Sequence, residues 1–336
     1  MERSSWYKPL VMQLIQKPPH LHCGICHSDL HQIKDDWGFS QYPMVPGHEI
    51  VGKVIQVGSE IQKFSVGQKV GVGCLVDSCQ ECPSCKDNEE QFCEQGSTQT
   101  YNGLDKHLGG MTYGGYSKLV VVDENFVLAM PEHLPTAASA PLLCAGITTY
   151  SPLKAANINA NSKVGIVGLG GLGHVAVKIA AAMGATVCVI SRTKDKLEDA
   201  KKLGATDYLA LNDGDSLTMA ASSFDFILDT VSAKHDINTL LNLLKPKATL
   251  TQVGLPSEPL TISVFPFIFK KINFTGSLIG GIAETQEMLD FCGQHNITAD
   301  IELLPMEQVN EALIRLENSD VKYRFVLDIE NWQPEA

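Results

Sequence analysis

The stretch "VGIVGLGGLGHVAVKIAAAMG", residues 164–184, decides the fold of the second half of the chain. It runs from a short apolar strand pattern through G-x-G-x-x-G into a helical pattern. Glycines in this context let the backbone approach a pyrophosphate at the start of a helix. The stretch therefore predicts a dinucleotide-binding turn. The residues expected to form it are Gly168, Gly170, Gly171, Leu172 and Gly173.

Short apolar runs alternate with helical patterns around this turn. Six runs are candidate strands: "VGIVG", "TVCVI", "DYLAL", "FDFILDT", "ATLTQVG" and "NFTGSL". Strands that alternate with helices predict an α/β class and a doubly wound parallel sheet. We expect this Rossmann-type domain to span residues 145–280.

The end of the second candidate strand bears on the choice of cofactor. An NAD site places an acid there, about 20 residues after the glycine motif, to bind the ribose 2′-hydroxyl. Here "TVCVI" is followed by "SRTKDK", which begins with no acid and carries cations. This favours the 2′-phosphate of NADP(H), and the alternative is a solvated helix start with incidental charge. The expected cofactor-binding residues here are Ser191, Arg192, Thr193 and Lys196.

A compact cysteine motif, "CQECPSCKDNEEQFC", occupies residues 79–93. Its cysteines follow C-x2-C-x2-C-x7-C, and four thiolates close a tetrahedral shell around Zn²⁺. The alternatives are an iron–sulfur cluster or unliganded thiols, but the run lacks the Cys-Pro ending of bacterial ferredoxin motifs. We predict structural zinc on Cys79, Cys82, Cys85 and Cys93.

Three separate motifs offer ligands for a second metal: "CGICHSD", "VPGHEIVG" and "APLLCAGIT". A catalytic zinc has three protein ligands and an open fourth position, and Cys26, His48 and Cys144 supply three. Such an open site requires Cys23 to remain outside the shell. Taken alone, His48 is more typical of a core histidine than of a ligand, and Cys144 is more typical of a small buried hydrophobe. Cys23 and Cys26 are also spaced like a thioredoxin-type redox pair, although no βαβ pattern lies beside them.

Length and composition limit the remaining possibilities. A chain of 336 residues predicts two domains, and residues 23–127 are dense in glycine and short β-rich runs, as in an irregular β-domain. The net charge of −12 with no basic block argues against nucleic-acid or membrane partners and favours small molecules. The first residues lack a signal-peptide pattern, so we expect a reducing, cytoplasmic location, where ten cysteines serve purposes other than disulfides.

Taken together in this order, these motifs resemble the zinc-dependent medium-chain alcohol dehydrogenases. The similarity is greatest to the cinnamyl alcohol dehydrogenase branch and its bacterial NADPH-dependent aldehyde reductases, and it runs from about Cys23 to Asp328. The resemblance implies a GroES-like catalytic domain over residues 1–144, the NADP domain over 145–280, and a segment 281–336 that returns to the first domain. It also implies a homodimer.

The resemblance assigns roles residue by residue. It implies catalytic zinc on Cys26, His48 and Cys144, with Glu49 beside the metal and Cys23 not a ligand. It further implies a proton relay from the oxygen at this zinc through Ser28, the cofactor ribose and His31, with Asp36 at the solvent end. Asp29 would orient His48, and the residues expected beside nicotinamide and substrate are Thr148 and Trp37.

The expected function is reduction of an aldehyde by NADPH, with two zinc ions per chain. One departure concerns the start: only 22 residues precede Cys23, where the family has a longer lead, and "KPPHLH" contains prolines that cannot donate ladder hydrogen bonds. We therefore expect a truncated or altered N-terminus. The rival functions are a non-catalytic, zinc-stabilised dinucleotide-binding protein and a thiol redox protein that uses Cys23 and Cys26.

Overall fold

The computed structural model describes residues 9–13, 22–256 and 258–332, and the chain divides into two compact units. The first unit comprises residues 1–147 and 280–336, and the second comprises residues 148–279. The sequence-based limits of 144/145 and 280/281 lie within three residues of these boundaries. The expectation of an altered start falls largely on residues 1–8 and 14–21, which lie outside the described residues.

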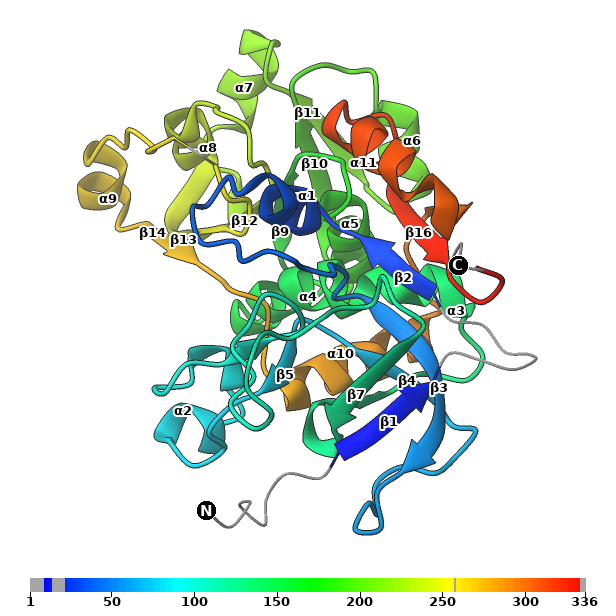
Figure 1. The fold of residues 1–336 in the computed structure, drawn as a ribbon. Helices are drawn as coiled ribbons and strands as arrows, with labels where there is room; N and C mark the ends of the chain where they lie inside the picture. The colour runs from blue at the N-terminus through cyan, green and yellow to red at the C-terminus, as the bar shows by residue number, and fades with distance from the viewer. Residues whose placement is uncertain (1–8, 14–21, 257, 333–336) are drawn as a thin grey trace. The chain divides into compact units, whose positions relative to one another are not determined.

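The second unit is built on a six-stranded parallel sheet in the order β11-β10-β9-β12-β13-β14 (Figure 1). Its strands are β9 (Lys163–Val167), β10 (Thr186–Ser191), β11 (Asp207–Ala210), β12 (Phe224–Asp229), β13 (Leu244–Gln252) and β14 (Asn273–Gly276). Each of the six expected runs forms one of these strands. The central ones are buried along nearly their whole length because helices cover a parallel sheet. The predicted doubly wound sheet is confirmed.

Helices connect these strands. They are α5 (Gly173–Ala182), α6 (Leu197–Lys202), α7 (Gly214–Ala220), α8 (Ile237–Leu243) and α9 (Phe265–Lys270). Strand order reverses at β9, which lies between β10 and β12. Ligands of such sheets bind outside the carboxyl ends of the strands at this switch point, so the turn after β9 is where a cofactor is expected.

The first unit is mainly antiparallel. Its large sheet runs β15-β16-β2-β3-β1-β7, with β4 and β8 attached through β3, and β5 and β6 form a separate pair. The strands are β1 (Pro9–Gln13), β2 (His22–Ile25), β3 (Ile50–Val57), β4 (Lys69–Val72), β5 (Leu75–Asp77), β6 (Thr98–Gln99), β7 (Leu119–Asp123), β8 (Leu128–Ala129), β15 (Ile301–Pro305) and β16 (Arg324–Asp328). This is the irregular β-domain that the sequence predicts.

Short helices connect the strands of the first unit. They are α1 (His27–Lys34), α2 (Pro83–Lys86), α3 (Thr136–Ser139), α10 (Ile282–His295) and α11 (Val309–Glu317), with single 3-10 turns η1 (Glu90–Phe92), η2 (Glu124–Phe126), η3 (Ala140–Leu143) and η4 (Met306–Gln308). Helix α4 (Ala145–Ala155) carries the chain from the first unit into the second. Within the described ranges, no helix has the length and apolar character needed to cross a membrane.

The segment 280–336 completes the sheet of the first unit. Strand β16 pairs antiparallel with β2, so that Leu327 lies opposite Cys23, and β15 extends the sheet by one more strand in parallel. The sequence predicted two helices and one strand here, and β15 is an addition. Strand β2, which carries Cys23, is thus paired with β3 on one side and with β16, from the segment 280–336, on the other.

Candidate functional site

Four side chains of the first unit bring their donor atoms together. One ligand atom from each of Cys26, His48, Glu49 and Cys144 lies within 4.8 Å of all the others. Cys26 precedes α1, His48 and Glu49 precede β3, and Cys144 follows η3, so three segments distant in sequence meet at one point. Two thiols and an imidazole are donors that suit Zn²⁺, and a shell of three leaves a position open.

The local fold of α1 fixes Cys26. Cys26 is the N-cap of this helix, and its backbone N–H donates to the Asp29 carboxylate over 2.8 Å. A capping carboxylate of this kind accepts a hydrogen bond from a backbone N–H that would otherwise lack a partner, and it stabilises the first turn of the helix. The Sγ atoms of Cys26 and Cys144 are 4.0 Å apart, and the hydrogen bond from Cys144 lowers the pKa of Cys26 well below its usual value.

Cys23 lies outside this group of four. Its Sγ donates to the Gly24 carbonyl at 3.6 Å, and it fills space so tightly that a Cβ on Gly47 or Gly115 would come within 2.8 Å of it. Burial raises the pKa of the Cys23 thiol well above its usual value. A buried thiol of high pKa is a poor nucleophile, so this geometry favours a packing role for Cys23 over a redox pair.

Asp29 orients the imidazole ring of His48 through Nδ1, the ring nitrogen that is not needed for a metal. Nδ1 of His48 lies 3.2 Å from Oδ1 of Asp29, which leaves Nε2 as the ring nitrogen available to a metal. Burial works to lower the pKa of His48, but the Asp29 charge and hydrogen bond outweigh it and raise the pKa well above its usual value. Asp29 is itself fully buried and also accepts from Gly47 N–H and the Tyr116 hydroxyl.

Glu49 pairs with Arg324, a residue that sequence reasoning missed. The guanidinium donates to Oε1 of Glu49, and both side chains are buried. Oε2 of Glu49 has no hydrogen-bond partner among the described residues. Burial raises the pKa of Glu49 to about 7, against the opposing charge of Arg324. An orphaned buried carboxylate oxygen beside two thiols and an imidazole fits a cation at this point.

The residues expected to carry protons lie along α1 and the loop after it. The Ser28 hydroxyl is 3.6 Å from Sγ of Cys26, and His31 lies one turn further along the helix. Nδ1 of His31 contacts Oδ2 of Asp36 at 2.7 Å, and the Trp37 ring lies 5.3 Å from the His31 ring. His31 and Asp36 are partly exposed, as the solvent end of a relay must be.

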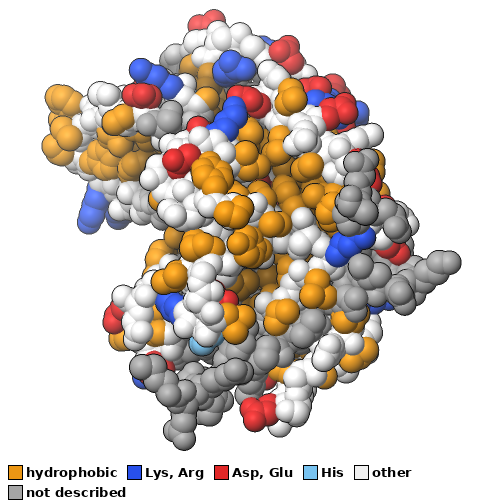
Figure 2. All heavy atoms as spheres, in the orientation of Figure 1, with side chains coloured by type: hydrophobic (Ala, Val, Ile, Leu, Met, Phe, Trp, Pro, Cys, Tyr) orange, Lys and Arg blue, Asp and Glu red, His pale blue; other side chains and the backbone are white. Residues whose placement is uncertain are grey.

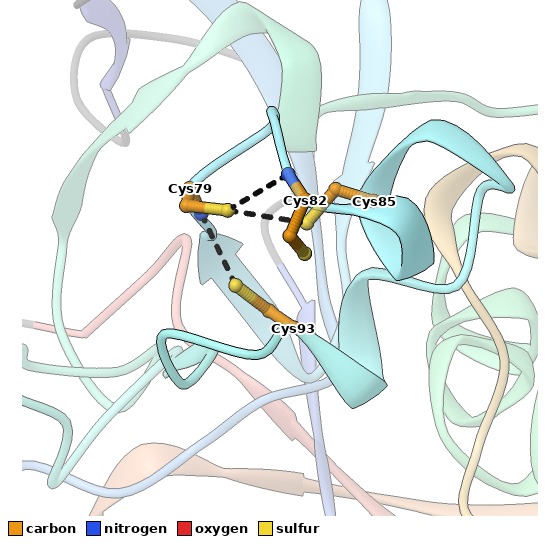
Figure 3. Close-up of side chains that lie close together, drawn as sticks. All are labelled: Cys79, Cys82, Cys85 and Cys93. Carbon is orange, nitrogen blue, oxygen red and sulfur yellow. Dashed lines mark hydrogen bonds between the residues drawn. The ribbon is translucent and has the colours of Figure 1, made fainter.

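The four-cysteine motif forms a second candidate metal site (Figure 3). Backbone N–H groups point at the sulfurs: Cys79 N–H at Cys93 over 3.4 Å, and Cys82 N–H at Cys79 over 3.3 Å. Backbone hydrogen bonds, including that of Glu94 N–H at 3.5 Å, lower the pKa of Cys82 to about 6. Donors aimed at sulfur stabilise thiolates, which is the form that binds zinc.

The lobe formed by residues 79–93 is tied to helix α10. Oε2 of Glu90 accepts from the backbone N–H of Ile282 at 3.0 Å. A Cβ on Gly281 would lie 1.8 Å from the Asn88 carbonyl oxygen, so only glycine allows this approach. The four-cysteine lobe therefore holds the start of the longest helix in the first unit.

In the second unit, the glycine turn after β9 has the shape of a phosphate cradle. Gly168 has φ of +86°, and a Cβ on Gly173 would lie 1.9 Å from the Gly168 carbonyl, so both positions require glycine. A Cβ on Gly170 would meet nothing within 4 Å, which leaves its backbone open to a ligand. The turn opens helix α5 and fits a dinucleotide pyrophosphate.

Polar and cationic residues follow β10, which ends at Ser191. Arg192 and Thr193 are exposed, and Nζ of Lys196 donates to the Leu169 carbonyl over 2.7 Å. Lys196 thus lies against the glycine turn itself, a contact that the sequence did not reveal. Thr148 is buried in α4.

Comparison with known proteins gives consistent matches over most of the chain. Residues 20–132 match the family model "Alcohol dehydrogenase GroES-like domain", and residues 171–294 match "Zinc-binding dehydrogenase". The chain is 54% identical over 306 residues to NADP-dependent alcohol dehydrogenase C 1 of Mycolicibacterium smegmatis, covering 91% of this chain and 87% of that protein.

Two solved structures are also similar. A cinnamyl alcohol dehydrogenase from Sorghum bicolor superposes with a TM-score of 0.92 at 46% identity, covering 98% of this chain and 92% of that one. The cinnamyl alcohol dehydrogenase from Helicobacter pylori, complexed with NADP(H), has a TM-score of 0.88 at 40% identity and covers 97% and 91%.

Proposed function

Because the chain belongs to the zinc-dependent medium-chain alcohol dehydrogenases, in the cinnamyl alcohol dehydrogenase branch, we propose that it reduces aromatic or aliphatic aldehydes to primary alcohols. It is a zinc- and NADP(H)-dependent oxidoreductase that acts on an alcohol–aldehyde pair. What we propose beyond this is the direction of the reaction, which is reduction, and the class of aldehyde that is reduced. The observation that carries it is the open group of Cys26, His48 and Cys144 with the Ser28 hydroxyl beside it.

In this proposal the catalytic zinc is held by Cys26, His48 and Cys144, with Glu49 as the carboxylate next to it. The structural zinc is held by Cys79, Cys82, Cys85 and Cys93. Residues 1–147 with 280–336 act as the catalytic unit, and residues 148–279 bind NADP(H). The two donor groups and the open backbone at Gly170 support these assignments.

When bound, zinc polarises the substrate carbonyl and NADPH supplies the hydride. The chain's own contribution is orientation and proton transfer. Asp29 holds the His48 ring through Nδ1, and the Ser28 hydroxyl donates the proton that the product alcohol gains. His31 would return a proton to Ser28, and Asp36, whose Oδ2 lies 2.7 Å from Nδ1 of His31, holds the imidazole ring at the solvent end.

NADP(H) is proposed to lie with its pyrophosphate on the turn formed by residues 168–173 and its 2′-phosphate near Ser191, Arg192, Thr193 and Lys196. The absence of a carboxylate at Ser191 and the exposed cation at Arg192 support this placement. The proposed nicotinamide and substrate neighbours are Thr148 and Trp37.

The test is a steady-state assay of zinc-loaded protein with NADPH and a panel of aromatic and aliphatic aldehydes. Saturable oxidation of NADPH with a stoichiometric yield of primary alcohol is expected. NADPH binding without turnover of any aldehyde in the panel would contradict the proposal and favour a non-catalytic dinucleotide-binding protein.

We also propose that the protein is a homodimer formed through the β14 edge. Strand β14 pairs only with β13 within the described part of the sheet. Beside it, α9 exposes Phe265, Ile268 and Phe269 at 66, 73 and 79%, and Figure 2 shows hydrophobic side chains gathered over this helix. An edge strand and an apolar helix face can both be covered by a second copy across a two-fold axis.

Light scattering coupled to size-exclusion chromatography tests the dimer. The unmodified chain should elute at twice the chain mass of 36.5 kDa, and Phe269→Glu should shift it towards the monomer. Leu108→Glu, at a residue 74% exposed in the first unit, is the matched control and should leave the dimer intact. A monomeric unmodified chain would refute the dimer.

We place the protein in the cytoplasm on the basis of its cysteines. All ten are free thiols, and six of them belong to the two metal-ligand groups, which need reduced sulfur. Cell fractionation with antibody detection should find the protein with cytoplasmic markers.

A further inference from the structure

The loop between β12 and α8, residues 230–236, packs against the glycine turn from within the second unit. The Thr230 hydroxyl donates to the Val167 carbonyl over 2.7 Å, at the last residue of β9. A Cβ on Gly168 would lie 2.8 Å from Cγ2 of Val231, so the two segments are in direct contact. The conformation of the glycine turn, residues 168–173, therefore depends on the position of this loop.

The same loop is held on its other side by the residues after β13. A Cβ on Gly254 would lie 2.3 Å from the Val231 carbonyl oxygen, and the Leu255 N–H donates to the Ser232 hydroxyl over 3.1 Å. Loop 230–236 is thus wedged between the segments that follow β9 and β13, at the sheet edge where ligands bind.

A histidine–carboxylate pair closes the loop on itself. Asp229, the last residue of β12, is fully buried, and its Oδ2 lies 2.6 Å from Nε2 of His235. Nδ1 of His235 lies 2.8 Å from the Ala233 carbonyl. Because both ring nitrogens face acceptors, the ring satisfies both only as an imidazolium, which donates from each nitrogen. The charged ring also compensates the buried carboxylate, whose other oxygen accepts from Val231 N–H at 3.0 Å.

We propose that His235, as an imidazolium bound to Asp229, is a positioning residue for NADPH binding: it holds Val231 against the Gly168 turn and so keeps that turn in its binding conformation. This inference rests on the proposed function, in which the turn binds the pyrophosphate. His235 acts through the loop and does not itself contact the reacting atoms.

The charges around His235 set the sign of the pH dependence. The hydrogen bond to Asp229 is the main reason that the pKa of His235 is raised, and the charges of Asp229 and of Asp236 at the start of α8 act in the same direction. The imidazolium is therefore fully present below the usual histidine pKa and is lost as pH rises through the higher folded-state value. NADPH affinity should fall over that upper interval.

The experiment measures NADPH dissociation constants from pH 6 to 9 without aldehyde, by titration calorimetry. His235→Gln should weaken NADPH about 10-fold at pH 6.5 and abolish the pH-dependent fall, because glutamine cannot carry the charge. His295→Gln, at an exposed histidine in the first unit, is the control and should keep the unmodified profile. Changes that arise from the ionisation of NADPH itself appear in all three proteins.

A second measurement on the unmodified, folded protein separates positioning from stability. Amide hydrogen exchange over residues 230–236, corrected for intrinsic pH effects, should accelerate above the His235 pKa by more than exchange in the buried strand β9 of the same unit. The proposal is overturned if His235→Gln binds NADPH within twofold of the unmodified chain at every pH, or if exchange in the loop is independent of the pKa. Normal NADPH binding with no aldehyde turnover would refute the proposed function alone.

Discussion

The carboxylate of Asp29 makes two contacts that link two of the proposed zinc ligands: Oδ1 lies 3.2 Å from Nδ1 of His48, and Oδ2 accepts from the backbone N–H of Cys26 at 2.8 Å. One buried side chain therefore sets both the ring orientation of one ligand and the backbone position of another. Replacing Asp29 should disturb the metal more than the fold.

Asp29→Asn should weaken the catalytic zinc by about 10- to 100-fold, because the neutral amide no longer stabilises the imidazole that donates from Nδ1. Competition with a chromogenic chelator measures this affinity. Asp215→Asn, at an exposed carboxylate of α7, is the control. Unchanged chelator competition in Asp29→Asn would show that Asp29 does not support the metal.

Cys23→Ser and Cys26→Ser are a matched pair within one motif. Metal analysis of the unmodified protein should give two zinc ions per chain, and Cys23→Ser should keep both because Cys23 packs against Gly47 and Gly115. Cys26→Ser should lose one zinc and turnover while keeping the fold by circular dichroism. Loss of zinc in Cys23→Ser would mean that the wrong cysteine has been assigned as the ligand.

Ser28→Ala should reduce turnover by about 10²-fold or more while leaving zinc content and NADPH affinity intact, since it removes only the hydroxyl of the proton path. Ser65→Ala, at an exposed serine, should have no effect on steady-state turnover. His31→Gln should have a smaller effect that varies with pH, because water can partly replace the imidazole. Full activity of Ser28→Ala would remove this residue from the mechanism.

Arg192→Gln should weaken NADPH by about 10- to 150-fold and leave NADH nearly unchanged, because a charge-assisted hydrogen bond to the 2′-phosphate contributes about 1.5–3 kcal/mol. Ser191→Asp should go further and shift preference towards NADH, since a carboxylate there repels the phosphate. Ratios of kcat/KM for the two cofactors measure both effects, with Lys202→Gln on the exposed side of α6 as control. An unmodified enzyme that uses NADH as efficiently as NADPH would contradict this assignment.

Cys93→Ser should release the start of α10 as well as the structural zinc. Glu90 accepts from Ile282 N–H within the first unit, and loss of this charge-assisted bond should speed hydrogen exchange at that amide about 10-fold. Cys292→Ser, a buried cysteine outside both metal-ligand groups, is the control. Normal exchange at Ile282 in zinc-depleted Cys93→Ser would show that the lobe does not hold the helix.

The sequence predicted the six strands of the second unit well because each is a short apolar run between turn residues, and a parallel strand is buried on both faces. Helix α1 was harder to predict. Its eight residues are mostly polar, and its N-cap is Cys26, whereas serine, threonine, aspartate and asparagine are the usual N-caps. Strand β15 was missed for a related reason, because it is only partly buried and lacks a clear alternation.

The four-cysteine set was predicted from its spacing, and Cys26, His48 and Cys144 were predicted from three separate motifs. The structure brings the donor atoms of each set within 4.8 Å of one another, and their roles as metal ligands stay a prediction. The partner of Glu49 could not be predicted in this way. Arg324 lies 275 residues further along the chain, and no local pattern marks an arginine in a buried strand as the partner of a particular glutamate. Contacts of this kind follow from topology, which places β16 beside β2.

That pairing of β16 with β2 has a consequence for synthesis on the ribosome. The sheet of the first unit lacks β16 until residue 328 has emerged, although β2 is made at residues 22–25. The second unit, residues 148–279, is by contrast uninterrupted in sequence and is complete earlier. Since domains generally fold as units during translation, the Rossmann unit should fold first. During that time the early strands of the first unit still lack β16 as a hydrogen-bonding partner. Those early strands are then the part of the nascent chain most in need of a chaperone.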